Sequence, residues 1–537
     1  MDALTQSILE KHINQQPSVE GRLVFDRDQS RYLHQGFWAA MYDEIGDLDF
    51  TLQSKPQIVD NFLLASLGSQ SCPEYSHPSR DEGDFLLKVF VEKVDPFVHL
   101  LHKPSFLSEL NHFRRGLLGS DTTFEIMLFT IYMLALLPLK PATVETRLHE
   151  PKVALMSRYR SYVEYGLSRK NITTSQSLST LQAFLLYMTH LFWIGEMLHV
   201  STLLGIAVAM ARRMGLHRDG SSFPLAPWQV ELRRRLWHHI VVLDGWCVEN
   251  HGLPPLVSLE HVNTALPQNS NDSAWDTSKF ASSRPAVVTT FTDMTISLLQ
   301  SEIGSLTTFT LKHPYTSSMD VRAYLDFQTE ILGKARQRLE STYLKCLDRN
   351  QVVHRLARDL ADLAFTRIRL IQLQPVLNAR GCGEQEQAEI AAKLYGMATD
   401  YCKTSQFLIS AYAPHNLDWA IVRAFSWHSV ATMLSMVLRH DSLASTPEAR
   451  AARSRIEKLF QNRSSIGYLA DNDSLWVPLQ KLRMELAVKE GTFEAKNLES
   501  VSSMDASVDL SHFGWNGEGV SSMFSGWGDD HMPEALR

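Results

Sequence analysis

Arg233, Arg234 and Arg235 stand in a row between tryptophans, and His238 and His239 follow them in the same apolar run. Side chains of these types could hold a phosphate backbone, ligate a metal ion or carry acid–base chemistry. In a helix, however, successive residues lie about 100° apart, so the three arginines fan over about 200° and cannot form one flat phosphate-binding surface. The two adjacent histidines face different directions for the same reason, so they cannot ligate one metal as an i, i+4 pair does.

The same run has the apolar spacing of a packed helix. Its stripe, at spacings of four, four and three, consists of Leu232, Leu236, Ile240 and Leu243, widened by Trp237 and Val241. A buried guanidinium must reach a carboxylate because its desolvation is costly, so at least one arginine should be paired to an acid. Glu231 lies within helical reach, and Asp219 and Asp244 are the other candidates. We expect a packed helix over about 227–250 with internal ion pairs; effector binding and nucleic-acid contact are the alternatives.

Metal and catalytic signatures are weak in this sequence. His99 and His102 have a spacing that could chelate a metal, but Pro104 interrupts the pattern and no third ligand is indicated. The five cysteines stand singly, at Cys72, Cys247, Cys346, Cys382 and Cys402, without a Cys-x-x-Cys pair. There is no Gly-x-Ser-x-Gly elbow, phosphate loop, dinucleotide fingerprint or His-Glu-x-x-His motif. We therefore predict no metal site, no cofactor site and no catalytic residue, and expect that the protein is not an enzyme.

Composition limits the classes of partner. The 537 residues include 52 Lys and Arg against 59 Asp and Glu, a formal net charge of −7, so no global positive field draws the chain to nucleic acid or an anionic membrane. The first residues lack a basic start followed by an apolar stretch, so no secretory signal is expected. The apolar segment 126–137 is closed by Pro138 and is shorter than the roughly 20 residues that span a bilayer. We expect an intracellular protein with no membrane segment.

Apolar spacing of three and four dominates the chain, while strand signals are sparse. The predicted fold class is all-α, a multi-helix regulatory domain with a disordered linker and a disordered C-terminal tail. Helices are expected at about 121–137, 143–169, 175–192, 197–214, 227–250, 284–310, 317–348, 352–376, 385–411, 417–440, 447–461 and 475–489. Turn-forming residues predict irregular structure over 71–84 and after about 491. The expected division is an N-terminal segment and linker (1–85), a helical domain (86–491) and an acidic, aromatic tail (492–537).

Five ordered pieces of this sequence resemble the fungal-specific transcription factor domain, which normally follows a six-cysteine binuclear zinc cluster in fungal regulators. They are "VDPFVHLLHKPSF" (94–106), "LQAFLLY" (181–187), "AVAMARRMGLHRDGS" (207–221), "ELRRRLWHHIVVLD" (231–244) and "HGLPPLVSLEHVNTALPQN" (251–269). Upstream, residues 30–48 are similar to the segment found between the zinc cluster and this domain in regulators of secondary-metabolite gene clusters.

The resemblance assigns structural or regulatory roles to the residues that carry its motifs. These are Asp95, Pro96, His102, Pro104, Phe106, Gly215, His217, Arg218, Arg234, Arg235, Trp237, Asp244, Gly252, Pro254 and Pro267. The chain departs from the family pattern at two places. Leu253 stands where the family usually has arginine before proline, and residues 1–71 contain no cysteine. The family's two zinc ions therefore have no ligands here, and the DNA-reading part is expected to be absent.

What the resemblance implies is a transcription regulator of the fungal zinc-cluster family, acting in the nucleus on a metabolic or secondary-metabolite gene cluster. The alternative is an accessory co-regulator that works without its own DNA contact. Expected partners are the transcription machinery or a DNA-binding protein, with homodimerisation and a small-molecule effector as further expectations. Direct DNA binding and membrane association are not expected.

The C-terminal tail sets aromatic residues among acids and small residues. Phe513, Trp515, Phe524 and Trp527 lie in a stretch with no arginine or lysine before Arg537. Such a segment cannot build a core alone, but it can dock its rings into a partner's groove. It resembles an activation segment; the alternative is a passive tail.

Overall fold

The computed structural model describes residues 22–26, 29–33, 77–117, 123–251, 254–257, 262–278, 283–316, 319–377, 383–424, 427–439, 454, 457 and 476–489. Nearly all of these residues are helical or join helices, so the fold class is all-α, as the sequence predicts. The described strands are β1 (Arg22–Asp26) and β2 (Gln29–Leu33), an antiparallel hairpin that the sequence analysis did not predict. The chain divides into one unit of residues 1–486 and a second of residues 487–537.

The N-terminal half of the described chain contains helices of different lengths. They are α3 (Arg80–Val89), the π-helical turn η2 (Phe90–Val94), α4 (Asp95–Val98), α5 (Lys103–Arg114), α6 (Thr123–Leu136), α7 (Pro141–Leu148), α8 (Lys152–Arg169), α9 (Leu178–Ile194), α10 (Met197–Arg213), the 3₁₀ turn η3 (Gly220–Ser222) and α11 (Pro227–His251).

The helices of the C-terminal half continue the same architecture. They are the 3₁₀ turn η5 (Asp272–Ala274), α12 (Thr295–Lys312), α13 (Val321–Thr342), η6 (Leu344–Cys346), α14 (Val352–Leu373), η7 (Gln374–Val376), α15 (Glu384–Tyr412), η8 (Ala413–His415), α16 (Asp418–Ala424), α17 (Trp427–Arg439) and α20 (Trp476–Lys489). No helix in these described ranges is long and apolar enough to cross a bilayer.

Several predicted boundaries differ from the observed ones for local reasons. The irregular stretch expected to reach residue 84 ends earlier, because Ser79 and Glu82 form a capping box that starts α3 at Arg80. The single helix expected over 143–169 is two helices, since Pro151 begins a new one. The helix expected from 284 begins at Thr295. Before it, the Asn269 side chain donates to the backbone oxygens of Val288 and Thr290, which keeps that backbone out of a helix.

Two other predicted segments also differ or cannot be placed. The helix expected over 417–440 is observed as α16 and α17. The helix expected over 447–461 lies outside the described residues except at positions 454 and 457.

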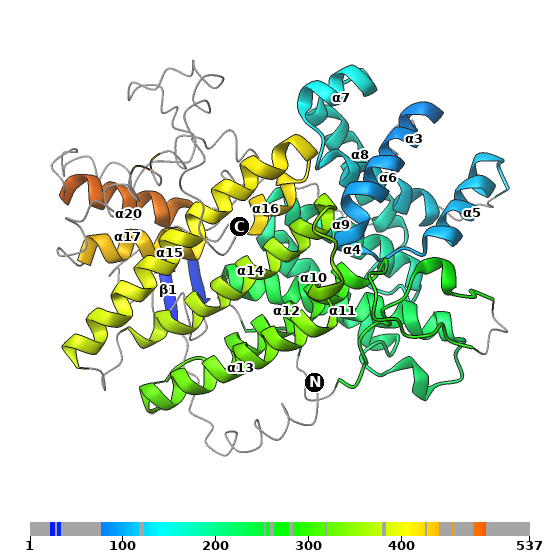
Figure 1. The fold of residues 1–537 in the computed structure, drawn as a ribbon. Coiled ribbons are helices and arrows are strands. Elements are labelled where there is room, and N and C mark those ends of the chain that lie inside the picture. Colours follow the sequence, from blue (N-terminus) through cyan, green and yellow to red (C-terminus); the bar gives the residue numbers. More distant parts are fainter. Residues whose placement is uncertain are drawn as a thin grey trace. The chain divides into compact units, whose positions relative to one another are not determined.

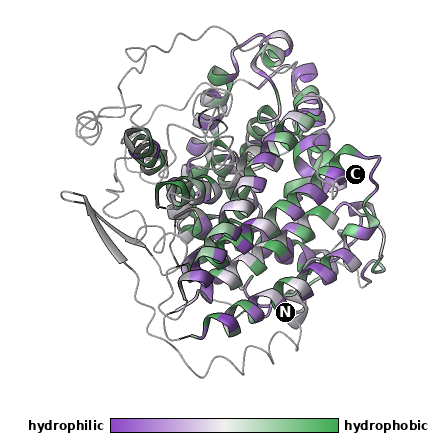
Figure 2. Ribbon diagram, turned by 60° about the vertical axis from the view of Figure 1, so that its left-hand side comes forward, coloured by the Kyte–Doolittle hydropathy of each residue, from purple (hydrophilic) through white to green (hydrophobic). Residues whose placement is uncertain are grey.

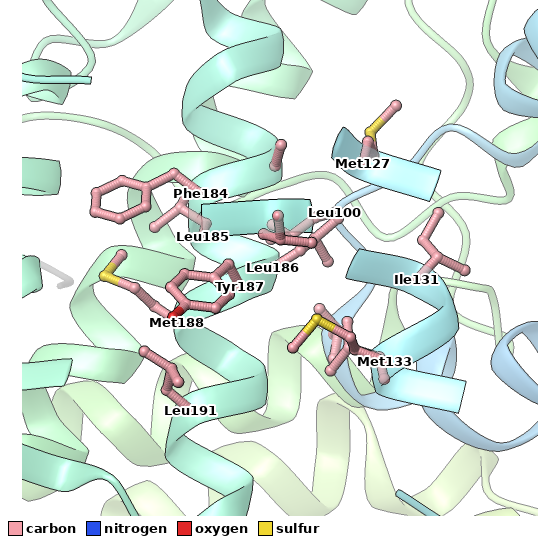
Figure 3. Packing of buried hydrophobic residues seen from close by; sticks show 14 of the residues in the cluster. Leu100, Met127, Ile131, Met133, Phe184, Leu185, Leu186, Tyr187, Met188 and Leu191 are labelled. Atoms are coloured by element: carbon pink, nitrogen blue, oxygen red, sulfur yellow. The ribbon is translucent and has the colours of Figure 1, made fainter. Parts of the chain in front are cut away.

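A first hydrophobic core is formed by α3 to α11. The apolar helix α6 is almost wholly buried and packs on α8 and α9. Figure 3 shows side chains of α9, such as Leu186 and Tyr187, gathered with Ile131 and Met133 of α6. The apolar segment 126–137, too short to span a bilayer, therefore contributes to this core through α6.

A second core is formed by α12 to α17 together with α20, where residues such as Leu370, Leu394 and Leu434 are fully buried. In Figure 1 these helices run from green to orange beside α11, which packs against α12. Figure 2 shows that single helices carry hydrophobic residues on one side and hydrophilic residues on the other, as amphipathic packing requires.

The two cores meet along an aromatic seam. The Trp193 ring lies 4.8 Å from the Trp419 ring and 6.1 Å from the Trp246 ring, measured between centroids, and Phe97 lies 6.0 Å from Trp419. Beside the seam, Arg367 of α14 pairs with Glu249 of α11 at 2.6 Å. The long helix α11 therefore belongs to the first core and is also bound to the second.

Candidate functional site

The arginine run lies on α11, where each arginine has a different partner. Arg235 is 2% exposed and is held by two carboxylates: its Nε donates to Glu231 at 3.0 Å and its Nη1 donates to Asp272 at 2.9 Å. Its guanidinium also lies 5.0 Å from the centre of the Trp228 ring. The prediction that at least one of the arginines is buried and paired to an acid is confirmed.

Asp272, in the turn η5, is the centre of a buried charged network. Its Oδ1 accepts from Arg235 and from His99 Nε2 at 3.2 Å, and its Oδ2 accepts from the backbone N–H of Lys103 at 2.9 Å. Burial acts to raise the pKa of Asp272, but the hydrogen bond and charge of His99 and the charge of Arg235 outweigh it and hold that pKa well below its usual value. Asp272 is therefore ionised at neutral pH.

His99 links Asp272 to the first core. Its Nδ1 donates to Asp95 at 3.1 Å, and the Nζ of Lys103 lies 3.5 Å from the same Asp95 oxygen. Burial acts to lower the pKa of His99, but the charge of Asp95 and the hydrogen bonds of both carboxylates outweigh it and raise that pKa above 6.5. The backbone of His99 has φ 40°, a left-handed conformation unusual for a residue other than glycine. Both ring nitrogens thus face carboxylate oxygens, an arrangement that favours the protonated ring.

His102 holds the same turn in a different way. As N-cap of α5, its Nδ1 accepts from the backbone N–H of Ser105 at 3.3 Å, so its Nε2 carries the proton and donates to the Asp272 carbonyl at 2.9 Å. The two histidines considered for metal chelation therefore hydrogen bond to protein acceptors. No group of three or more metal-ligating side chains occurs in the described part of the chain.

A second pair joins Arg234 to Asp219. Arg234 Nε and Nη2 donate to the two carboxylate oxygens of Asp219, each at 2.8 Å. The same carboxylate accepts from the backbone N–H groups of Ser221 at 3.0 Å and Ala265 at 2.9 Å. One bidentate ion pair thus fixes the loop after α10 and the segment 262–268 against α11. Of the two distant acids considered for the arginines, Asp219 is the one that pairs.

Asp244 accepts hydrogen bonds from the backbone and not from an arginine. Its two oxygens accept from the N–H groups of Leu256 at 3.0 Å and Val257 at 2.9 Å, and burial raises its pKa. The prediction that Asp244 pairs with one of the arginines is therefore wrong. The loop after α11 leaves N–H groups without a helical acceptor, and a buried carboxylate satisfies them.

His238 and His239 point apart, as predicted. His238 Nε2 donates to the carbonyl of Ala265 at 3.0 Å, whereas His239 Nε2 lies 2.7 Å from the Thr189 hydroxyl. Burial lowers the pKa of each to about 4. Both rings are therefore neutral at physiological pH.

The remaining motif residues divide into buried and exposed groups. Trp237, Phe106 and Pro267 are buried, Pro96 and Pro104 stand in the first turns of α4 and α5, and Gly215 ends α10 with φ 75°. His217 is half-buried, whereas Arg218 and Pro254 are exposed. Gly252 and the tail aromatics Phe513, Trp515, Phe524 and Trp527 lie outside the described residues.

The sequence analysis missed the most connected residue of the site. Asp272 lies beyond the five motif pieces, and only the irregular, polar 269–272 stretch signalled a capped turn there. Glu249 was missed as well, because its partner Arg367 comes from another helix. The acids and bases of the network are bonded mainly to one another, which fits the positioning of elements better than acid–base catalysis.

Comparisons with known proteins show which sequences and structures this chain is similar to. Residues 87–360 match the fungal specific transcription factor domain. The chain is 28% identical over 384 residues, 67% of its length, to the aurofusarin cluster transcription factor aurR2 of Gibberella zeae, and covers 55% of that protein. It is 31% identical over 288 residues, 47% of its length, to the C6 finger domain transcription factor hasF of Aspergillus fumigatus, and covers 38% of it.

Two further likenesses concern a cluster regulator and the fold. A pyriculol/pyriculariol biosynthesis cluster transcription factor of Pyricularia oryzae is 31% identical over 189 residues, 35% of this chain and 25% of that protein. The chain thus spans about half, or less, of the length of these curated relatives. A chain in the structure of the K. lactis CBF3 core shares the fold, with a TM-score of 0.55 and 11% identity over 86% of this chain and 93% of that one.

Proposed function

The chain belongs to the fungal specific transcription factor domain family, and on that basis we propose that it regulates transcription of a fungal secondary-metabolite gene cluster. The observation that carries the proposal is the match over residues 87–360 together with relatives named as regulators of such clusters. The proposed site of action is the nucleus.

The physical role proposed for the helical body is to transmit a signal between its parts as one unit. Asp272 ties the 94–106 motif to α11, and Asp219 ties the loop after α10 to the same helix. Four of the five family motifs are joined through α11, so a displacement of one motif would move the others. The bonding of these acids and bases to one another supports a regulatory role in preference to catalysis, and we propose no zinc, other cofactor or membrane partner for this chain.

DNA recognition is then proposed to come from outside the described body. The five single cysteines do not supply the six thiolates of a binuclear zinc cluster. A second candidate is a co-regulator that reaches DNA through a DNA-binding partner. A homodimer and a small-molecule effector remain proposals of the same kind.

The test is disruption of the gene in its native fungus, followed by transcript measurement across the genome. The expected result is a coordinated change in a set of adjacent biosynthetic genes, restored when the gene is returned. Unchanged transcripts under conditions in which the protein is expressed would contradict the proposal. Chromatin capture of the tagged protein, with and without a candidate DNA-binding partner, separates the regulator from the co-regulator.

A further inference from the structure

The carboxyl-terminal ends of two helices and the early turns of a third lie together on one surface. Arg213, at the end of α10, donates through Nη2 to the carbonyl of Thr173, in the turn after α8, at 2.7 Å. Arg233 of α11 donates through Nη1 to the carbonyl of Met214, which caps α10, also at 2.7 Å. These contacts join three segments that are separate in the sequence.

This shared surface is rich in cations. We define the basic surface as Arg169, Arg212, Arg213, Arg218 and Arg233, of which Arg233 is half-buried and the others are exposed. Residues 165–178 and 197–218 contain no aspartate or glutamate. The nearest acids along the chain are already paired: Glu164 and Glu196 with Arg160, Asp219 with Arg234, and Glu231 with Arg235.

Helix dipoles account for only part of this charge. A helix carboxyl terminus is equivalent to roughly −0.5 of an elementary charge, so the ends of α8 and α10 together offset about one cation of the five. The rest generate a local positive field on a chain whose formal net charge is −7. The basic surface therefore has more positive charge than the fold itself requires.

The pKa values of Arg233 and of the neighbouring His217 are both lowered. Burial lowers the pKa of Arg233, whose Nη1 donates to a carbonyl instead of a carboxylate. Burial, followed by the charges of Arg218 and Arg212, lowers the pKa of His217. An anion bound here would relieve both effects, because it would compensate the half-buried guanidinium and the crowded positive charges.

The neighbouring side chains indicate which anion fits. Every exposed residue of 165–179 and 201–218 is polar, glycine or alanine, and the polar ones include Asn171, Thr173 and Thr174. Arginines combined with neutral hydroxyl and amide donors form the set that contacts phosphate oxygens. A peptide partner of high affinity would instead need a large apolar anchor, which these exposed positions do not offer.

We propose that the basic surface binds the phosphate backbone of duplex DNA without reading base sequence. It would hold the helical body against DNA, whichever molecule recognises the base sequence. This inference goes beyond the proposed function and stands independently of it, because it concerns phosphate contacts by this chain alone.

The test measures binding of the purified full chain to a fluorescent duplex of mixed sequence over a series of salt concentrations. The tested variant carries Arg212→Ala, Arg213→Ala and Arg218→Ala. The control carries Arg115→Ala, Arg322→Ala and Arg349→Ala, which removes the same charge from exposed positions elsewhere. If each tested arginine contacts one phosphate, the slope of log affinity against log salt falls by about 3 units, and affinity at low salt falls about tenfold or more.

The control variant should bind as the parent protein does, and all three proteins should melt at similar temperatures. Loss of affinity by the control variant as large as that of the tested variant would show a diffuse charge effect and overturn the proposal. Absence of parent binding to duplex DNA at low salt would overturn it too. Binding of a polyglutamate probe in place of DNA would assign the surface to an acidic protein and equally contradict the proposal.

Discussion

His99 and Asp272 are hydrogen bonded across 173 positions of the sequence, with ring Nε2 and carboxylate Oδ1 3.2 Å apart. The same carboxylate oxygen accepts from Arg235 of α11, so one atom joins the first helical motif to the arginine helix. This contact makes the network sensitive to single substitutions.

Asp272→Asn should destabilise the protein by about 3–5 kcal/mol, because it leaves the buried cations His99 and Arg235 without a shared carboxylate. The free energy of unfolding from denaturant titration measures the effect. Asp326→Asn makes the same chemical change at an exposed position of α13 and should shift stability by less than about 0.5 kcal/mol. Equal effects of the two substitutions would mean that the network contributes nothing special.

Stability should fall as pH rises through the folded-state pKa of His99. The folded pKa is raised above the usual 6.5, so the contribution is fully present below 6.5 and is lost at higher pH. His99→Asn suits the left-handed backbone and removes the titrating ring. The difference in unfolding free energy between parent and variant should shrink between pH 6 and pH 9. A difference that stays constant over that window would show that His99 is not charged in the folded state.

Acid should destabilise the protein through its buried neutral histidines. Burial lowers the pKa of His190 and His428 to about 3 and that of His239 to about 4. Since the unfolded rings take up protons near 6.5, this contribution is present above pH 6.5 and is lost as pH falls. His239→Gln should flatten the stability profile between pH 6.5 and pH 4, whereas His415→Gln, at an exposed site, should leave it unchanged. An unaltered profile in the His239 variant would refute this account.

Breaking the Glu249–Arg367 pair should be more harmful than replacing it. Burial raises the pKa of Glu249 despite the nearby charge of Arg367, so Glu249→Ala leaves a buried guanidinium and should cost about 3–5 kcal/mol. The double variant Glu249→Met with Arg367→Met should recover most of that loss, because methionines fill similar volume without charge. Equilibrium unfolding measures the free energy of unfolding of both variants. A double variant less stable than the single variant would indicate that the charges themselves hold α11 to α14.

The tail of residues 492–537 lies outside the described residues, and its activating role stays a prediction. Fused to an unrelated DNA-binding domain, it should activate a reporter gene. Changing Phe513, Trp515, Phe524 and Trp527 to alanine should abolish activation more completely than neutralising its acids, since ring burial determines how long a complex lasts. An inactive fusion, or full activity after loss of the rings, would make the tail a passive extension.

The purified 537-residue chain should show no preference among DNA sequences. Two arginines of the three-arginine run are already paired with acids: Arg234 with Asp219, and Arg235 with Glu231 and Asp272. Neither is free to contact base edges. Competition between duplexes of different sequence at constant salt measures this. A preference of one sequence over others by two orders of magnitude would contradict the prediction.

The sequence alone determined the helical class and the burial of α11, because apolar spacing of three and four is a local property of the chain. It also indicated Glu231 as a partner for the arginine run, since a separation of three or four residues brings side chains to one face of a helix; the structure pairs Glu231 with Arg235. The order of the motif pieces was enough to indicate the family that residues 87–360 match.

Only the tertiary structure decided which distant acid meets which base. Asp219 and Asp244 looked equivalent in the sequence, yet one pairs with Arg234 and the other satisfies backbone N–H groups of a loop. Asp272 became the centre of the network because the fold brings η5 beside α5 and α11, and no local pattern encodes that approach. Such choices depend on the packing of helices far apart in the chain, which determines where a buried charge finds its partner.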